Sequence, residues 1–321
     1  MKKQTKIWLV IAACLILTGC AIFGGSMATV KWDFKQLSTG RYETNRHELG
    51  GAFQSIRIET DTADVRFVPS ESAGILVECY EQIHATHTVE ICDGVLVVEL
   101  ADTRKWYEHI GIFFDSPKIT VAIPQGEYEA LTVKNDTGDV TLPKDFRFHE
   151  AEISTDTGDI SVFGSVNALI LKASTGALRV EGIDAQTMEL SVTTGGVQVS
   201  SVACKDDVSV RVSTGKAILR DLSCQNLSSE GNTGDILLQN VIADGSLSIK
   251  RSTGAVKLDR CDAAEILIHT STGDVKGSVL SEKVFLAYTD TGRVRVPSSI
   301  QGGRCEIHTS TGNITMEILA Q

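Results

Sequence analysis

Residues 151–162 decide the fold, and they read Ala-Glu-Ile-Ser-Thr-Asp-Thr-Gly-Asp-Ile-Ser-Val. Apolar residues alternate with polar ones on both sides of the central Thr157-Gly158 pair. A period of two is typical of a β-strand with one buried face. The short polar residue before Thr-Gly favours a tight turn, because its side chain can hydrogen-bond the turn backbone and glycine accepts a positive φ. The stretch therefore predicts a strand, a turn and a second strand.

The same unit recurs along the chain. Ten Thr-Gly pairs between residues 137 and 312 follow one another at intervals of 18–20 residues. Apolar residues occupy the positions seven and five before, and two and four after, nearly every glycine of this series. Such self-similarity predicts stacked coils whose inward side chains merge into one core. The glycines are Gly138, Gly158, Gly176, Gly195, Gly215, Gly234, Gly254, Gly273, Gly292 and Gly312.

We therefore expect an all-β protein, a parallel β-helix-like solenoid of about ten coils over residues 131–321. Residues 51–130 contain a degenerate coil with Ala63 in the glycine position, and strand patterns at Ile75–Tyr80, Val89–Ile91 and Val95–Leu100. We interpret this region as a β cap that protects the open end of the stack. Residues 31–50 are predicted to form a tether.

The N-terminus is predicted to hold the protein on a membrane. Lys2, Lys3 and Lys6 precede Ile7–Val30, which contains no charged residue. As a helix this segment would span ~36 Å, against ~30 Å of bilayer hydrocarbon. The lysines favour a cytoplasmic N-terminus and an extracytoplasmic body. Residues 1–30 are either an uncleaved signal anchor or a lipoprotein signal, in which Leu17-Thr18-Gly19-Cys20 is a lipobox and Cys20 receives lipid.

The charge of the exported part excludes some partners. Without the three N-terminal lysines, 27 basic residues face 41 acidic ones, a formal charge of −14. An acidic body argues against nucleic-acid binding and against docking on anionic lipid. We expect the partner to be an envelope protein or polymer that the sequence does not identify.

One outward column is rich in basic residues. The residues four before each glycine should point to solvent, and seven of them are Lys134, Lys172, Arg211, Lys250, His269, Tyr288 and His308. Such a stripe is compatible with contact to an anionic envelope polymer or a partner. It is equally compatible with charged decoration that keeps a β surface soluble and discourages edge pairing.

A second surface feature is acidic. Asp139, Asp159, Asp235 and Asp274 follow their glycines directly. Clustered carboxylates can bind Ca²⁺, or act as acid and base in β-helical enzymes that cleave polysaccharides. Favourable turn chemistry is the simpler explanation.

Cys79, His84, His87 and Cys92 have the spacing C-x4-H-x2-H-x4-C, which invites a zinc interpretation. A hairpin turning near Ala85-Thr86 would place the cysteines and the histidines on opposite faces, which disfavours one tetrahedral site. A Cys79–Cys92 disulfide and unpaired thiols remain open alternatives. We assign no catalytic, cofactor or metal residue, because the sequence contains no nucleotide-binding or nucleophile motif.

The chain resembles the bacterial putative-adhesin β-strand-repeat family, seen mainly in Gram-positive bacteria. The resemblance rests on the Thr-Gly coils, the lysine-led apolar segment, Trp32-Asp33-Phe34-Lys35-Gln36-Leu37-Ser38-Thr39 and Arg104-Lys105-Trp106-Tyr107. It implies a membrane-anchored solenoid, sometimes encoded near envelope-stress systems, with no established catalytic residues.

We expect a non-catalytic surface protein rather than an enzyme, acting as an adhesin-like interaction protein or as an envelope-stress accessory protein. The alternative is an envelope glycan-binding or glycan-cleaving β-helix protein. A glycan site usually needs aromatic side chains along one face, and the repeats contain few of them.

Overall fold

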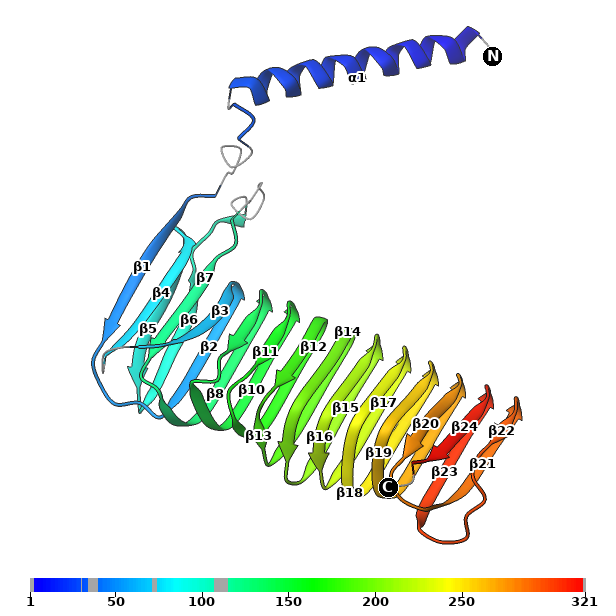
Figure 1. Cartoon of the computed structure of the whole chain (residues 1–321). Helices are drawn as coiled ribbons and strands as arrows, with labels where there is room; N and C mark the ends of the chain where they lie inside the picture. The colour runs from blue at the N-terminus through cyan, green and yellow to red at the C-terminus, as the bar shows by residue number, and fades with distance from the viewer. Residues whose placement is uncertain (1–2, 30, 34–39, 71–73, 107–114, 320–321) are drawn as a thin grey trace.

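The computed structural model describes residues 3–29, 31–33, 40–70, 74–106 and 115–319. Within these residues it contains one α-helix and 24 β-strands that belong to a single hydrogen-bonded sheet. The sheet winds into a solenoid, with the coils side by side along one axis (Figure 1). The predicted all-β solenoid is therefore confirmed.

Each coil has one long face that leads to the Thr-Gly corner and a second face that leaves it. The strands that run to the corner stack in parallel on their counterparts. They are β8 (Gly126–Thr137), β10 (Phe146–Thr157), β12 (Val166–Glu181), β14 (Thr187–Cys204), β15 (Asp207–Thr214), β17 (Asn226–Thr233), β18 (Ile236–Thr253) and β19 (Val256–Thr272).

The second face is formed partly by short separate strands and partly by long strands that continue around a corner. The separate strands are β9 (Val140–Leu142), β11 (Ile160–Val162), β13 (Asp184–Ala185), β16 (Ala217–Cys224) and β20 (Val275–Val279). Six residues after the corner glycine, several coils bend again at a residue with φ near +50°: Ser201, Asp221, Asn240 and Arg260. A left-handed residue turns the chain sharply there, so that it can return to the long face.

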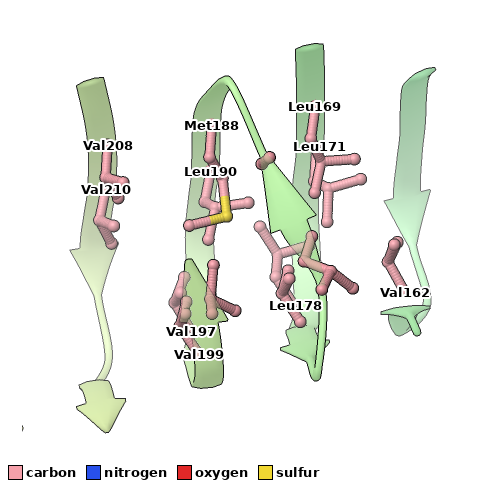
Figure 2. Close-up of a cluster of buried hydrophobic side chains, with 14 of the residues drawn as sticks. Val162, Leu169, Leu171, Leu178, Met188, Leu190, Val197, Val199, Val208 and Val210 are labelled. Carbon is pink, nitrogen blue, oxygen red and sulfur yellow. The ribbon is translucent and has the colours of Figure 1, made fainter. Parts of the chain in front are cut away.

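The columns seen in the sequence pair across neighbouring coils. Leu171 lies opposite Leu190, and Val180 lies opposite Val199. The inward side chains form one continuous core from Ile56 to Met316. Figure 2 shows part of it, where Leu171, Leu190 and Val210 come from successive coils. Because the stacked aliphatic rows exclude water from each other, no coil buries its apolar face alone.

The corner glycines stack directly on one another. A Cβ atom placed on Gly215 would lie 1.5 Å from the carbonyl oxygen of Gly195, and φ of Gly215 is +142°. Both the close approach and the backbone conformation exclude larger side chains. This explains why glycine recurs at this position in all ten repeats.

The N-terminal cap departs from the parallel order. Its strands are β1 (Tyr42–Leu49), β2 (Ser55–Thr62), β3 (Asp64–Pro69), β4 (Ile75–Gln82), β5 (Ala85–Cys92), β6 (Val95–Asp102) and β7 (Lys118–Ile123). The degenerate coil, β2 and β3, stacks on β8 and β9 on one side and on β6 and β7 on the other. Strands β4, β5 and β1 then add in antiparallel orientation and end the stack.

One expectation about this region needs adjustment. The tether predicted over residues 31–50 is shorter, because Tyr42–Leu49 forms strand β1 and pairs with β4. The three predicted cap strands are confirmed as β4, β5 and β6. Part of the family motif, residues 34–39, lies outside the described residues, as does Tyr107.

The C-terminal coils are not stacked in sequence order, which corrects the expectation that successive corners lie directly above one another. Strands β23 (Gly303–Thr311) and β24 (Ile314–Ile318) pair with β19 and β20. Strands β21 (Lys283–Thr291) and β22 (Val294–Arg295) lie outside them, at the end of the stack (Figure 1). Residues 297–302, which begin with Pro297, provide the connection that lets the last coil return inward. The 19-residue spacing gave no sign of this exchange.

Helix α1 spans Lys3–Thr29. Its segment Ile7–Thr29 is long and apolar enough to cross a membrane, judged by length and composition. The helix runs unbroken through Cys20, whose side chain is exposed.

Candidate functional site

The predicted stripe does lie on the outside of the solenoid, with every member exposed or half-buried. Its basic residues are, however, largely neutralised by acidic side chains. Lys172 contacts Glu152 at 2.9 Å, and Arg211 contacts Glu189 at 2.7 Å. Lys134 lies 3.9 Å from Glu59. This pairing fits charged decoration better than a continuous binding track for an anionic polymer.

The stripe ends in a stack of aromatic rings. Because the last two coils are exchanged, His308 lies between His269 and Tyr288. The Nδ1 atoms of His269 and His308 are 3.1 Å apart, so one imidazole donates a hydrogen bond to the other. Tyr288 stacks on His308, with ring centroids 5.5 Å apart. Regular spacing in the sequence could not predict this order.

The distal end of the solenoid, formed by β21, β22 and residues 296–302, is uncovered. Among the described strands, β21 pairs only with β23 and β22 only with β24. Leu286, Tyr288 and Ile300 are 51%, 59% and 93% exposed. Phe285 and Ala287, which occupy core columns, are only partly buried. The proximal end is capped by antiparallel strands, so the two ends of the stack differ in chemistry.

The acidic edge has a structural role that the sequence pattern alone did not reveal. The Oδ1 atom of Asp159 accepts a hydrogen bond from the backbone N–H of Ala177 in the next coil, at 2.7 Å. In the same way Asp139 Oδ1 accepts from Asp159 N–H, and Asp235 Oδ1 accepts from Ala255 N–H. Asp274 accepts from Asn313 N–H, which with Lys276 holds the pKa of this carboxyl below its usual value. These carboxylates therefore connect neighbouring coils.

The four-residue Cys/His pattern is not brought together. The hairpin turns at Ile83-His84 rather than at Ala85-Thr86, since Gln82 pairs with Ala85. Cys79 is buried and Cys92 is exposed, and both are free thiols, so the disulfide alternative is not found in the structure. His87 is buried on the inner side of β5, next to the carboxylate of Glu81, which the Cys/His pattern had not included.

Glu81 is buried in the cap. The inward positions of β4 read Ile75, Val77, Cys79 and Glu81, so the strand continues its apolar column with a carboxylate. Glu81 Oε2 lies 2.6 Å from His87 Nδ1 and accepts a hydrogen bond from His87 N–H at 2.8 Å. Simple alternation along β4 would have placed Glu81 inside, and this signal was missed.

Neighbouring polar groups complete the cluster. The amide of Asn45 donates to Glu81 Oε1 at 2.8 Å, and Thr60 Oγ1 lies 2.9 Å from His87 Nε2. Burial by itself raises the pKa of Glu81, but the hydrogen bonds from His87 and Asn45 outweigh it and lower the pKa. Burial and the nearby Glu81 charge raise the pKa of the Cys79 thiol to about 12.

A cavity of about 260 Å³ adjoins this cluster. His87 forms part of its wall, together with Tyr42, Asp61, Gln82 and Arg104. The guanidinium of Arg104 is held by Asp102, with Nη2 2.6 Å from Oδ2. The imidazole of His87 therefore borders a partly polar cavity in the cap.

One charged side chain is buried in the solenoid itself. Arg251 is 1% exposed, and its guanidinium fills the space left by the small residues Gly231 and Ser229. Nη2 donates to Ser229 Oγ at 2.9 Å, while Nε has no partner. Burial lowers the pKa of Arg251. No acidic group within the described residues forms an ion pair with it, so the side chain has a packing role at an electrostatic cost.

Comparison with known proteins found solved structures that are similar to this chain. Structures that resemble it include a "putative adhesin" from Bacteroides fragilis, with 15% identity, a TM-score of 0.37 and coverage of 86% of this chain and 97% of that one. A "putative adhesin" from Parabacteroides distasonis has 12% identity and a TM-score of 0.44, and the match covers 86% of this chain and 98% of that one. A "putative lipid binding protein" from the same species has 13% identity and a TM-score of 0.33, and the match covers 88% of this chain and 98% of that one.

No curated protein matches the sequence. Residues 53–317 match the Toastrack DUF4097 family, a span that includes nearly the whole solenoid and its cap. The chain therefore belongs to the Toastrack family of adhesin-like β-repeat proteins, whose function is not established.

Proposed function

We propose that this protein is a non-catalytic interaction protein, tethered to the membrane and extracytoplasmic, that holds an extended segment of an envelope protein at the distal end of its solenoid. The observation that carries the proposal is the difference between the two ends. Within the described residues each end finishes in a strand that pairs on one side only, β1 with β4 and β21 with β23. Strand β21 exposes the apolar side chains of Leu286 and Tyr288, whereas β1 exposes no large apolar side chain.

An unpaired edge strand offers a row of free backbone N–H and C=O groups to another extended chain. Natural proteins usually cover or charge such an edge, yet β21 exposes Leu286 and Tyr288 beside it. On the adjoining β22, Arg295 is exposed and Val294 is 44% exposed, and Arg293, which directly precedes this strand, is exposed too. This combination supports a protein partner that adds a strand.

The apolar helix supports membrane tethering, and two forms of the anchor are distinguishable. A signal anchor leaves the chain starting near Met1, whereas lipoprotein processing makes Cys20 the first residue and adds lipid to its thiol. The intact mass of the mature protein separates them. A mature chain that begins after residue 30 would refute tethering in either form.

The extracytoplasmic location can be tested with the protein's own thiol. Cys92 is the exposed cysteine of the body, because the other exposed thiols, Cys14 and Cys20, lie in α1. A membrane-impermeant maleimide added to intact cells should label the wild type and not Cys92→Ser. Labelling that appears only after lysis would place the body inside.

The interaction itself can be tested by charge. Leu286→Asp places a carboxylate on the distal edge, and Gln198→Asp places one on an exposed side face of a middle coil. Chemical crosslinking in the native envelope should capture the same partner with the wild type and Gln198→Asp, and lose it with Leu286→Asp. Equal capture by both variants would contradict distal binding.

Glycan binding is a second candidate, favoured by the exposed ring stack of His269, His308 and Tyr288. Aromatic faces are a common platform for sugar rings, which stack on them. Purified envelope glycan should then retain the wild type and release Tyr288→Ala. Retention that does not depend on Tyr288 would exclude this site.

A further inference from the structure

We propose that Cys79, Glu81 and His87 form a binding site for zinc inside the N-terminal cap. All three residues are buried, and their ligand atoms lie within 4.8 Å of one another. Thiolate sulfur, imidazole nitrogen and carboxylate oxygen are the donors that Zn²⁺ uses in proteins. The site is independent of the proposed contact at the distal end.

The cap positions the three donors on a rigid frame. Cys79 and Glu81 are two residues apart on β4, so they point to the same side of the strand. His87 comes from β5, which continues from β4 through the Ile83-His84 turn. Donor atoms around tetrahedral zinc are about 3.5 Å apart, as bond lengths of ~2.0–2.3 Å require. The 2.6 Å contact between Glu81 and His87 must therefore open by about 1 Å when zinc enters.

The surrounding hydrogen bonds are compatible with a bound metal as well as with the metal-free pair. Zinc at His87 Nδ1 leaves the Nε2 hydrogen to be donated to Thr60 Oγ1, which is already 2.9 Å away. Asn45 holds Glu81 Oε1, so the metal would bind Oε2, which also accepts a hydrogen bond from His87 N–H. Each ligand that has a second polar atom thus has that atom fixed by a neighbour, as in established zinc sites.

The protons of the binding step balance. The Cys79 thiol releases its proton to water as the Zn–S bond forms. The imidazole, which directs Nδ1 at Glu81 in the empty site, loses the hydrogen from Nδ1 and gains one at Nε2 through solvent. In this proposal the metal enters from the cavity whose wall includes His87, and a water molecule is the fourth ligand.

Cobalt reports on this site directly. The full chain in detergent, reduced and stripped of metal, is titrated with Co²⁺ and then with Zn²⁺. The background is His269→Gln/His308→Gln, because that exposed imidazole pair could bind metal without a thiol. We expect about one Co²⁺ per chain, with tetrahedral visible bands and a near-ultraviolet thiolate-to-cobalt band that Zn²⁺ removes.

Variants assign the ligands. Cys79→Ser should abolish the thiolate band, and Glu81→Gln or His87→Gln should weaken binding about 100-fold or more. Thr60→Val should weaken it about tenfold. The matched controls are Cys92→Ser and His84→Gln, which alter the same residue types nearby and should leave the titration unchanged.

Folding is checked on the metal-free proteins. Cys79→Val suits the apolar column of β4 and should keep the β-sheet circular dichroism and the unfolding temperature of the metal-free parent. In the parent, zinc should raise the unfolding temperature, and in Cys79→Val it should not. A thiolate band that survives Cys79→Ser, the absence of a band in the parent, or an equal zinc shift in Cys79→Val would each overturn the proposal.

Discussion

Replacing Gly215 by alanine is expected to destabilise the solenoid far more than replacing a glycine that lies outside the stacked corners. The added Cβ would lie 1.5 Å from the carbonyl oxygen of Gly195, whereas real Cβ contacts are essentially never below 3.0 Å. The two corners must therefore separate by at least 1.5 Å. Such a shift exceeds the tolerance of the hydrogen bond from Val197 N–H to Lys216 O, which is 2.9 Å long.

The magnitude follows from two terms. Placing a residue with a side chain at φ +142° costs about 1–3 kcal/mol. Loss of about two corner hydrogen bonds adds about 2 kcal/mol. We expect a decrease of about 3–5 kcal/mol in the free energy of unfolding, with local opening of the stack at this coil.

The matched control is Gly182→Ala. Gly182 also has a positive φ, +68°, but a Cβ there would meet no atom within 4 Å. Its expected cost is about 1–2 kcal/mol, from the left-handed conformation alone. Urea unfolding of the two variants and the wild type, followed by far-ultraviolet circular dichroism, gives the comparison. A Gly215→Ala variant no less stable than Gly182→Ala would refute directly stacked corners.

Three further predictions concern groups that connect or fill the coils. Asp159→Ala should lose about 1 kcal/mol in the free energy of unfolding, because Ala177 N–H loses its acceptor. Asp159→Asn keeps an acceptor oxygen, so this variant and the control Lys216→Ala should stay within about 0.5 kcal/mol of the wild type in urea unfolding. Equal losses for the alanine and asparagine variants would contradict a role for the Asp159 hydrogen bond between coils. Asp274 has a folded pKa below its ordinary 3.8, so its contribution is present at neutral pH and is lost as the pH falls through that folded value; Asp274→Asn should flatten the acid side of a plot of unfolding temperature against pH, and an unchanged acid side would count against it. The double variant Arg251→Met/Ser229→Ala, which removes Arg251 together with its side-chain partner, should leave the free energy of unfolding unchanged or raise it by about 1 kcal/mol. The control is Arg220→Met, at an exposed arginine. A loss above about 2 kcal/mol in the double variant would show that the buried charge stabilises the fold.

The repeating part of this fold was predictable because its information is local. The columns around residues such as Ile153, Leu171 and Leu190 encode both the alternation and the register, and a solenoid repeats one set of contacts at every layer. The cap strands were also predictable, since β4 and β5 alternate in the same way and β6 begins with a run of apolar residues.

The two ends were harder to predict, because their pairings join segments that are distant in the chain. Gly292 and Gly312 keep the regular interval, yet Gly312 stacks on Gly273 and Gly292 on Gly312. Only weak signs accompany the exchange, such as Pro297 and the small Ala287 in a core column. The buried cluster of Glu81 and His87 was missed for a related reason. Asn45, which contacts Glu81, and Thr60, which contacts His87, come from β1 and β2, which no local spacing connects to them.

The most direct test of the proposed contact is a photo-crosslinking scan along the solenoid in intact cells. A photoreactive residue is placed, one at a time, at Leu286 and Ile300 on the distal end, at Gln198 on a middle coil, and at Glu43 on the exposed side of β1. The account predicts one envelope protein crosslinked at Leu286 and Ile300, and little at the other two positions. Crosslinks concentrated at Gln198 or Glu43, or a self-linked dimer as the sole product at Leu286, would contradict it.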